Sequence, residues 1–83
     1  MKIPDEIYKR EKFQFLLKKI RQKSGVRQID MAEQLGVSQS FISKYESGER
    51  RVDIFELWEI CHLLGVSLLD FIQQLEENIS ETE

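Results

Sequence analysis

The sequence predicts an all-α fold, a compact domain of five helices. Four glycines divide the 83-residue chain, and each follows a stretch whose apolar residues recur with the period of a helix. Glycine readily adopts the positive φ at which helices end, so each glycine indicates a helix C-terminus. We expect residues 1–8 to form a lead-in and the start of the first helix, residues 9–79 the folded domain and residues 80–83 a C-terminal tail.

The first predicted helix begins near Pro4 or Asp5 and ends at about Lys23. Its apolar residues fall at i, i+3, i+4 and i+7, namely Phe13, Leu16, Leu17 and Ile20. This spacing places all four on one side of a helix and predicts that this side faces the core.

Two shorter helices joined by a tight turn are predicted over residues 28–35 and 39–46. In the first, Met31, Ala32 and Leu35 share one face, and Gly36 ends it. Ser38 is placed to cap the second helix by accepting from backbone N–H groups that have no partner inside it. The buried side of the second helix is expected to comprise Val37, Ile42 and Tyr45. The outward side is expected to comprise Gln39, Ser40, Ser43 and Lys44.

The outward side chains have the chemistry of a DNA-reading surface. Gln can bond both N6 and N7 of adenine, and Lys and Ser can reach base edges or phosphates in a major groove that admits one helix. The alternative is that they are ordinary polar residues on a solvated helix. Phe41, beside them, either packs against a neighbouring helix or contacts a thymine methyl group.

Two further helices are predicted over residues 53–64 and 67–79. Asp53 and Glu56 have the spacing of a capping box, and Ser67 is placed to cap the last helix. The core residues expected on these helices are Leu57, Ile60, Cys61, Leu64, Leu68, Phe71 and Leu75. Cys61 is expected to be a buried thiol, and His62, the one histidine, a surface residue.

Charge is distributed unevenly along the chain. Residues 1–51 hold all twelve Lys and Arg with seven Asp and Glu, a net of +5, whereas residues 52–83 hold eight acids and no Lys or Arg, a net of −8. The asymmetry suggests that the basic part meets a polyanion; the alternative is a surface whose charge merely confers solubility. With no signal-peptide pattern and no long apolar run, we expect a cytoplasmic protein.

The stretch at residues 28–50 resembles a known family. Gln-x-x-Met-Ala-x-x-Leu-Gly-Val-Ser-Gln-Ser-x-Ile-Ser-x-Tyr-Glu-x-Gly-x-Arg is similar to the helix-turn-helix of the lambda-repressor-like, or XRE, transcriptional regulators. The similarity continues, more weakly, from about Phe13 to Phe71. It implies a five-helix lambda-repressor-like fold, with the helix-turn-helix over residues 28–46, and sequence-specific binding of double-stranded DNA by a small bacterial or phage regulator, such as a repressor.

The resemblance also assigns roles to individual residues. It implies base reading by Gln39, Ser40, Ser43 and Lys44. It implies phosphate contacts at Gln28, Ser47, Arg50 and Arg51, with Gln28 also bracing Gln39. Arg27 stands where the family usually has a capping Thr, so Asp30 is left to complete the helix start, and we conjecture that Arg27 contacts a phosphate. Arg21 and Glu46 are expected to form a structural ion pair; the alternative is two unrelated surface charges.

A second apolar surface is expected on the last two helices, where four residues lie off the core stripes: Phe55, Trp58, Ile72 and Ile79. Such a patch often marks a partner site, and a homodimer would place two reading helices one DNA turn apart. Alternatively, these residues simply complete the core.

Two other function classes compete with DNA regulation. An antitoxin-like interaction protein would bind a protein partner through the acidic C-terminal half. An enzyme has little support, because the chain shows no phosphate loop, metal-ligand spacing or catalytic triad. We therefore expect no catalytic residues, no cofactor and no metal.

Overall fold

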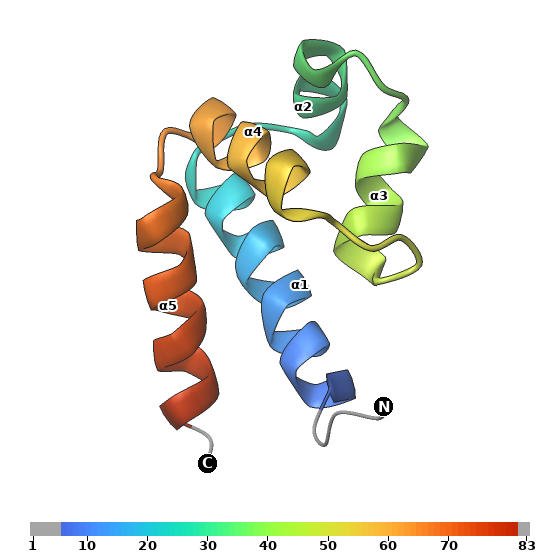
Figure 1. The fold of residues 1–83 in the computed structure, drawn as a ribbon. Helices are drawn as coiled ribbons and strands as arrows, with labels where there is room; N and C mark the ends of the chain where they lie inside the picture. Colours follow the sequence, from blue (N-terminus) through green and yellow to red (C-terminus); the bar gives the residue numbers. More distant parts are fainter. Residues whose placement is uncertain (1–5, 82–83) are drawn as a thin grey trace.

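The computed structural model describes residues 6–81, which form five helices and no strand. The helices are α1 (Glu6–Lys23), α2 (Gln28–Leu35), α3 (Gln39–Ser47), α4 (Ile54–Leu64) and α5 (Leu68–Glu81). Figure 1 shows α1 and α5 running side by side, with α4 across one end of this pair and α2 and α3 on the side of α1 away from α5. The predicted five-helix class is confirmed.

The helix boundaries follow the capping residues. Ser38 Oγ accepts from Phe41 N at 3.3 Å, and Ser67 Oγ accepts from Asp70 N at 2.9 Å. Asp53 and Glu56 form the expected reciprocal box, with N–H···O distances of 2.8 and 3.0 Å. These bonds satisfy backbone N–H groups that have no partner inside the helix.

The C-terminal end of the last helix differs from the prediction, and the predicted start of the first helix cannot be compared with the structure. The last helix continues to Glu81 instead of ending near Ile79, because neither Ser80 nor Glu81 is a helix breaker. Residues 80 and 81 therefore extend α5 and are not a separate tail. The predicted start at Pro4 or Asp5 lies outside the described residues.

The core is assembled from the predicted stripes. Every helix contributes, and the buried apolar residues are Leu16, Leu17, Ile20, Met31, Ala32, Ile42, Tyr45, Leu57, Ile60, Cys61, Leu64 and Phe71. Phe13 meets Phe71 edge to face at 5.5 Å between ring centroids, which fastens α1 to α5. Cys61 is buried as expected, and its apolar surroundings raise the pKa of its thiol to about 11.

Candidate nucleic-acid interface

The turn between α2 and α3 is fixed from both sides. Gly36 has φ 72°, and the N–H groups of Gly36 and Val37 bond to the last carbonyls of α2 at 3.3 and 3.0 Å. Ser38 then begins α3 two residues later. The short connection leaves little freedom in the angle between the two helices.

The two sides of α3 differ completely in exposure. Ile42 is 0 % exposed and Tyr45 is 2 % exposed, whereas the four predicted outward residues are all exposed, as the spacing required. They are Gln39, Ser40, Ser43 and Lys44. The helix therefore offers two hydroxyls, an amide and an ammonium group to the outside while its other side holds it in the core.

An ion pair with little solvent exposure sets the position of α3 relative to α1. Arg21 Nε and Nη2 donate to the two carboxylate oxygens of Glu46 at 2.5 and 3.1 Å, and Arg21 Nη1 donates to Val26 O at 2.8 Å. The two charged side chains are only 9 % and 4 % exposed. The expected pair is present, and its fork geometry restrains the end of α3 in direction as well as distance.

Gln28 joins the same cluster. Its Nε2 donates to Glu46 Oε1 at 3.0 Å, so it braces the carboxylate at the end of α3. The resemblance had implied that Gln28 braces Gln39; in this structure its amide holds Glu46. As a result, the Glu46 carboxylate of α3 accepts hydrogen bonds from both α1 and α2, and this one group joins the three helices.

Arg27 and Asp30 form the start of α2. Asp30 accepts from the Arg27 N–H at 3.2 Å and from Arg27 Nε and Nη2 at 2.9 Å each. The Arg27 guanidinium beside it lowers the pKa of the Asp30 carboxyl. Asp30 thus completes the start of α2 as expected, and the Arg27 side chain, 76 % exposed, remains at the surface.

A cluster of side chains that the sequence did not predict joins α3 to the segment that follows it. The Arg50 guanidinium stacks 4.0 Å from the centre of the Phe41 ring, and Phe41 meets Tyr45 edge to face at 4.8 Å. Phe41 is half-buried in these contacts, which favours the packing role over contact with a thymine methyl group. The sequence signal was Phe41 and Tyr45 one turn apart, with an Arg five residues later.

Glu56 links this cluster to α4. Tyr45 donates its hydroxyl to Glu56 Oε2 at 2.5 Å, while Glu56 Oε1 caps the first turn of α4. Burial, followed by this hydrogen bond, raises the pKa of Tyr45 to about 12. A buried tyrosine usually has a hydrogen-bond partner for its hydroxyl, so the predicted burial of Tyr45 could have indicated that such a partner exists.

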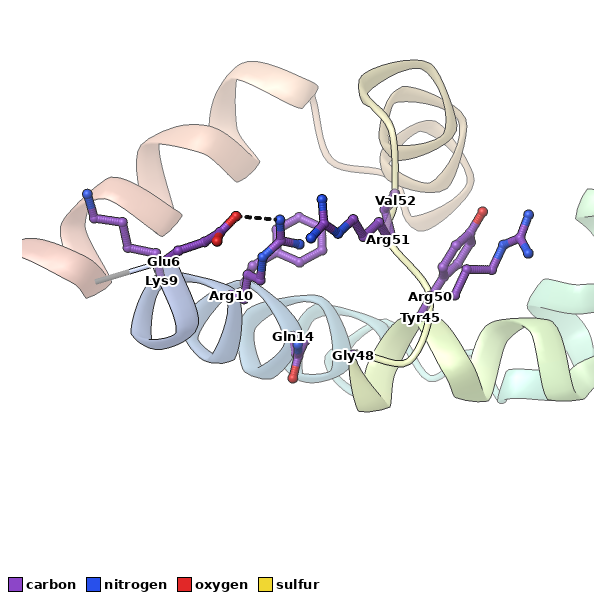
Figure 2. Close-up of a pocket in the computed structure, with 10 residues that line it drawn as sticks. Glu6, Lys9, Arg10, Gln14, Tyr45, Gly48, Arg50, Arg51 and Val52 are labelled. Carbon is purple, nitrogen blue, oxygen red and sulfur yellow. Dashed lines mark hydrogen bonds and ion pairs between the residues drawn. The ribbon is translucent and has the colours of Figure 1, made fainter. Parts of the chain in front are cut away.

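The two neighbouring arginines of the segment 48–53 face different ways. Figure 2 shows Arg50 beside Tyr45, and Arg51 over the N-terminal part of α1. Ser47, also a predicted phosphate ligand, is exposed and donates its hydroxyl to Lys44 O at 3.3 Å. Of the predicted phosphate ligands, Arg27, Ser47, Arg50 and Arg51 lie at the surface near the ends of α2 and α3, and Gln28 lies half-buried between them.

The predicted partner face is exposed in three of its four members. Phe55 is 72 % exposed, Trp58 58 % and Ile72 39 %, whereas Ile79 is half-buried against the protein. Ile54 and Leu69, at 50 and 75 %, extend the apolar surface on α4 and α5.

Within residues 6–81, no three His, Cys, Asp or Glu side chains converge as a metal site, and no helix is long and apolar enough to cross a membrane. His62 lies exposed on α4, as predicted.

Comparison with known proteins gives concordant matches. The helix-turn-helix family matches residues 17–71. An HTH-type transcriptional regulator of Sinorhizobium fredii, y4dJ, is 29% identical over 59 residues, which cover 71% of this chain and 77% of that protein.

Solved structures of similar size resemble the fold closely. An XRE-family like protein from Pseudomonas syringae has a TM-score of 0.79 and 33% identity, covering 84% of this chain and 85% of its own. The wild-type restriction-modification controller protein C.Esp1396I has a TM-score of 0.78 and 32% identity, covering 87% and 95%. The clp gene regulator ClgR from Corynebacterium glutamicum has a TM-score of 0.79 and 28% identity, covering 89% and 79%.

Proposed function

Since the chain belongs to the helix-turn-helix family of XRE-type regulators and is a DNA-binding transcriptional regulator, we propose that α3 enters the major groove and reads base sequence. The observation that carries this proposal is the division of α3 into a buried side and an exposed polar side. The base-reading residues are Gln39, Ser40, Ser43 and Lys44. Gln39, at the first turn, is best placed for a bidentate contact with adenine, because recognition helices contact bases with their N-terminal residues.

The anchoring of α3 supports specific rather than merely electrostatic binding. Reading bases requires a helix held at a fixed angle, and the fork between Arg21 and Glu46, braced by Gln28, restrains that angle. The role of this ion pair is geometric: a buried pair contributes little net stability but is directional.

Phosphate contacts beside the C-terminal end of α3 position the protein on the duplex. Arg27 and Gln28 serve at the start of α2, and Ser47, Arg50 and Arg51 serve at the segment that follows α3. Arg50 is already oriented by the Phe41 ring, so it loses less conformational freedom on binding than a free side chain. These contacts fix the orientation of the module and carry no sequence information.

A selection from a random duplex pool tests the proposal, followed by titration of the selected site. Gln39→Ala is expected to cost about 1–3 kcal/mol on that site and to relax preference at one base pair. Arg50→Ala should weaken selected and random duplexes alike and flatten the salt dependence. Gln73→Ala, on the exposed side of α5, is the control. Equal effects of Gln39→Ala and Arg50→Ala on random DNA would contradict the assignment.

We further propose that the exposed apolar residues of α4 and α5 pair two copies of the chain. The residues of this face are Phe55, Trp58 and Ile72, which are exposed, and Ile79, which is half-buried. A two-fold dimer presents two α3 helices to half-sites one DNA turn apart. Light scattering should show a dimer that Trp58→Ser converts to monomer, with loss of half-site symmetry in the selected DNA. Phe15→Ser, which removes an exposed aromatic residue from α1, should leave the dimer intact.

The alternative occupant of the apolar face is a different protein, as in an antitoxin-like module. A monomer by light scattering that co-purifies in fixed ratio with a second small protein would favour it. In either case the protein acts by binding alone, in the cytoplasm, where bacterial and phage genomes are transcribed.

A further inference from the structure

A cavity of about 310 Å³ lies between the N-terminal half of α1 and the segment 48–53. Figure 2 shows Arg10 of α1 on one side of it and Arg51 on the other, with Gln14 and Gly48 where the two elements meet. The helix-turn-helix motif begins at Gln28, so nothing in the motif assigns a role to this part of α1.

The lining is strongly basic. Lys9, Arg10 and Arg51 contribute positive charges and Glu6 a negative one, whereas Arg50, which also lines the cavity, directs its guanidinium to the Phe41 ring. Glu6 accepts from Arg10 Nη2 at 2.8 Å, whereas Lys9 and Arg51 are paired with no carboxylate in the described part of the chain. Like charges gathered around one cavity repel each other, and an anion placed between them relieves that repulsion.

The position of the cavity indicates where the anion comes from. The nine residues of α3 span about 13 Å at 1.5 Å per residue, close to the roughly 12 Å width of the major groove. A helix that fills the groove therefore meets the sugar-phosphate backbone near its own end. Gly48 ends α3 and also lines the cavity, so the backbone that borders the groove would pass close to the cavity when α3 lies in the groove as proposed.

We infer that this cavity is a phosphate site for the DNA backbone, in which Arg10 and Lys9 of α1 act together with Arg51. Glu6 weakens phosphate binding at this site, because the Glu6 carboxylate accepts a hydrogen bond from Arg10 and repels an incoming phosphate. The inference rests on the proposed function, and it adds α1 to the elements that contact DNA.

The first test is a gain of binding, which a loss of folding cannot imitate. Glu6→Gln frees Arg10 and removes the opposing charge, so the affinity for duplex DNA should rise about threefold to tenfold at low salt. Glu11→Gln removes the same charge from the same helix at a residue outside the cavity, and its effect should be smaller. An equal rise for both variants, or no rise for Glu6→Gln, would overturn the inference.

The second test measures the number of phosphate contacts. Arg10→Gln and Lys9→Gln should each lower the slope of log K against log salt, by up to about 0.9 for a phosphate contact that is lost. Lys19→Gln, at an exposed residue of α1 outside the cavity, should leave the slope unchanged. If all three variants lower the slope equally, the cavity is not a specific site.

Neutral methylphosphonates then locate the contact. One substituted phosphate should weaken the wild-type complex and have no further effect on the Arg10→Gln complex. The Arg10 chemical shifts are also measured with inorganic phosphate. If they respond to it while no phosphate of the duplex shows this coupling, the cavity is a small-molecule site and the backbone assignment is refuted. If the wild-type chain binds no duplex at all, the proposed function itself fails.

Discussion

Glu46→Gln tests the point where α1, α2 and α3 are joined. The substitution keeps the shape of the side chain but removes the charge that faces Arg21, and it turns an amide donor toward guanidinium donors. The Glu46 carboxylate now accepts three hydrogen bonds, two from Arg21 and one from Gln28, and the paired side chains are only 9 % and 4 % exposed. Arg21 would be left almost buried with an unbalanced charge.

The expected cost is large relative to the stability of so small a domain. Removing one partner of a buried ion pair costs about 3–5 kcal/mol, and we expect the lower end because Arg21 keeps its bond to Val26 O. An 83-residue domain has roughly 4–12 kcal/mol of stability. At about 4–8 °C for each kcal/mol, a loss of 3 kcal/mol lowers the Tm by roughly 12–24 °C.

Urea unfolding followed by circular dichroism gives the free energy of unfolding of the single variants and of a double variant, Arg21→Met with Glu46→Leu. Replacing both charges by apolar groups removes the unpaired charge, so the double variant should be more stable than either single variant. It should nevertheless bind its selected DNA less tightly than the wild-type protein, because the angle of α3 is no longer restrained. Single-variant costs below about 1 kcal/mol, or costs that simply add in the double variant, would refute this reasoning.

Three further predictions follow from local geometry. Gly48→Ala and Gly36→Ala should each cost about 1 kcal/mol in the same urea experiment, because both residues have a positive φ, 87° and 72°; the Cβ at residue 48 meets only the amide end of the flexible Gln14 side chain, which can move aside. The pKa of Tyr45 is raised to about 12 from an ordinary value near 10, so its contribution to stability is complete below pH 10 and is lost as pH rises toward 12; Tyr45→Phe should flatten stability measured across that range. Burial raises the pKa of Cys61 to about 11, so a thiol reagent should label it only at the rate of unfolding, and faster labelling would contradict its burial.

The sequence predicted the helices well because their ends are decided locally. Ser38, Asp53 and Ser67 cap the helices at which they were placed, since a cap depends only on residues three positions away. Core stripes were equally readable from the 3.6-residue period. The last helix was predicted too short, because a run of polar residues does not indicate where a helix frays.

The candidate site was less predictable because its contacts join residues far apart in the chain. Arg21 and Glu46 were paired by resemblance alone; no spacing rule connects positions 25 residues apart. Gln28 was assigned to Gln39, yet its amide reaches Glu46. The local sequence around Arg50 does not show whether its side chain faces solvent or the Phe41 ring. Only the packed structure distinguishes these two positions.

The separation of α3 into a packed and an unpacked side has a consequence for how such proteins diversify. Ile42 and Tyr45 hold the helix, while Gln39, Ser40, Ser43 and Lys44 add nothing to the core. Exchanges at exposed positions of this kind usually change stability by no more than about 0.5 kcal/mol. With the proposed base-reading role of these four residues, a descendant of this chain can acquire a new target by substitutions at four codons, without passing through unstable intermediates.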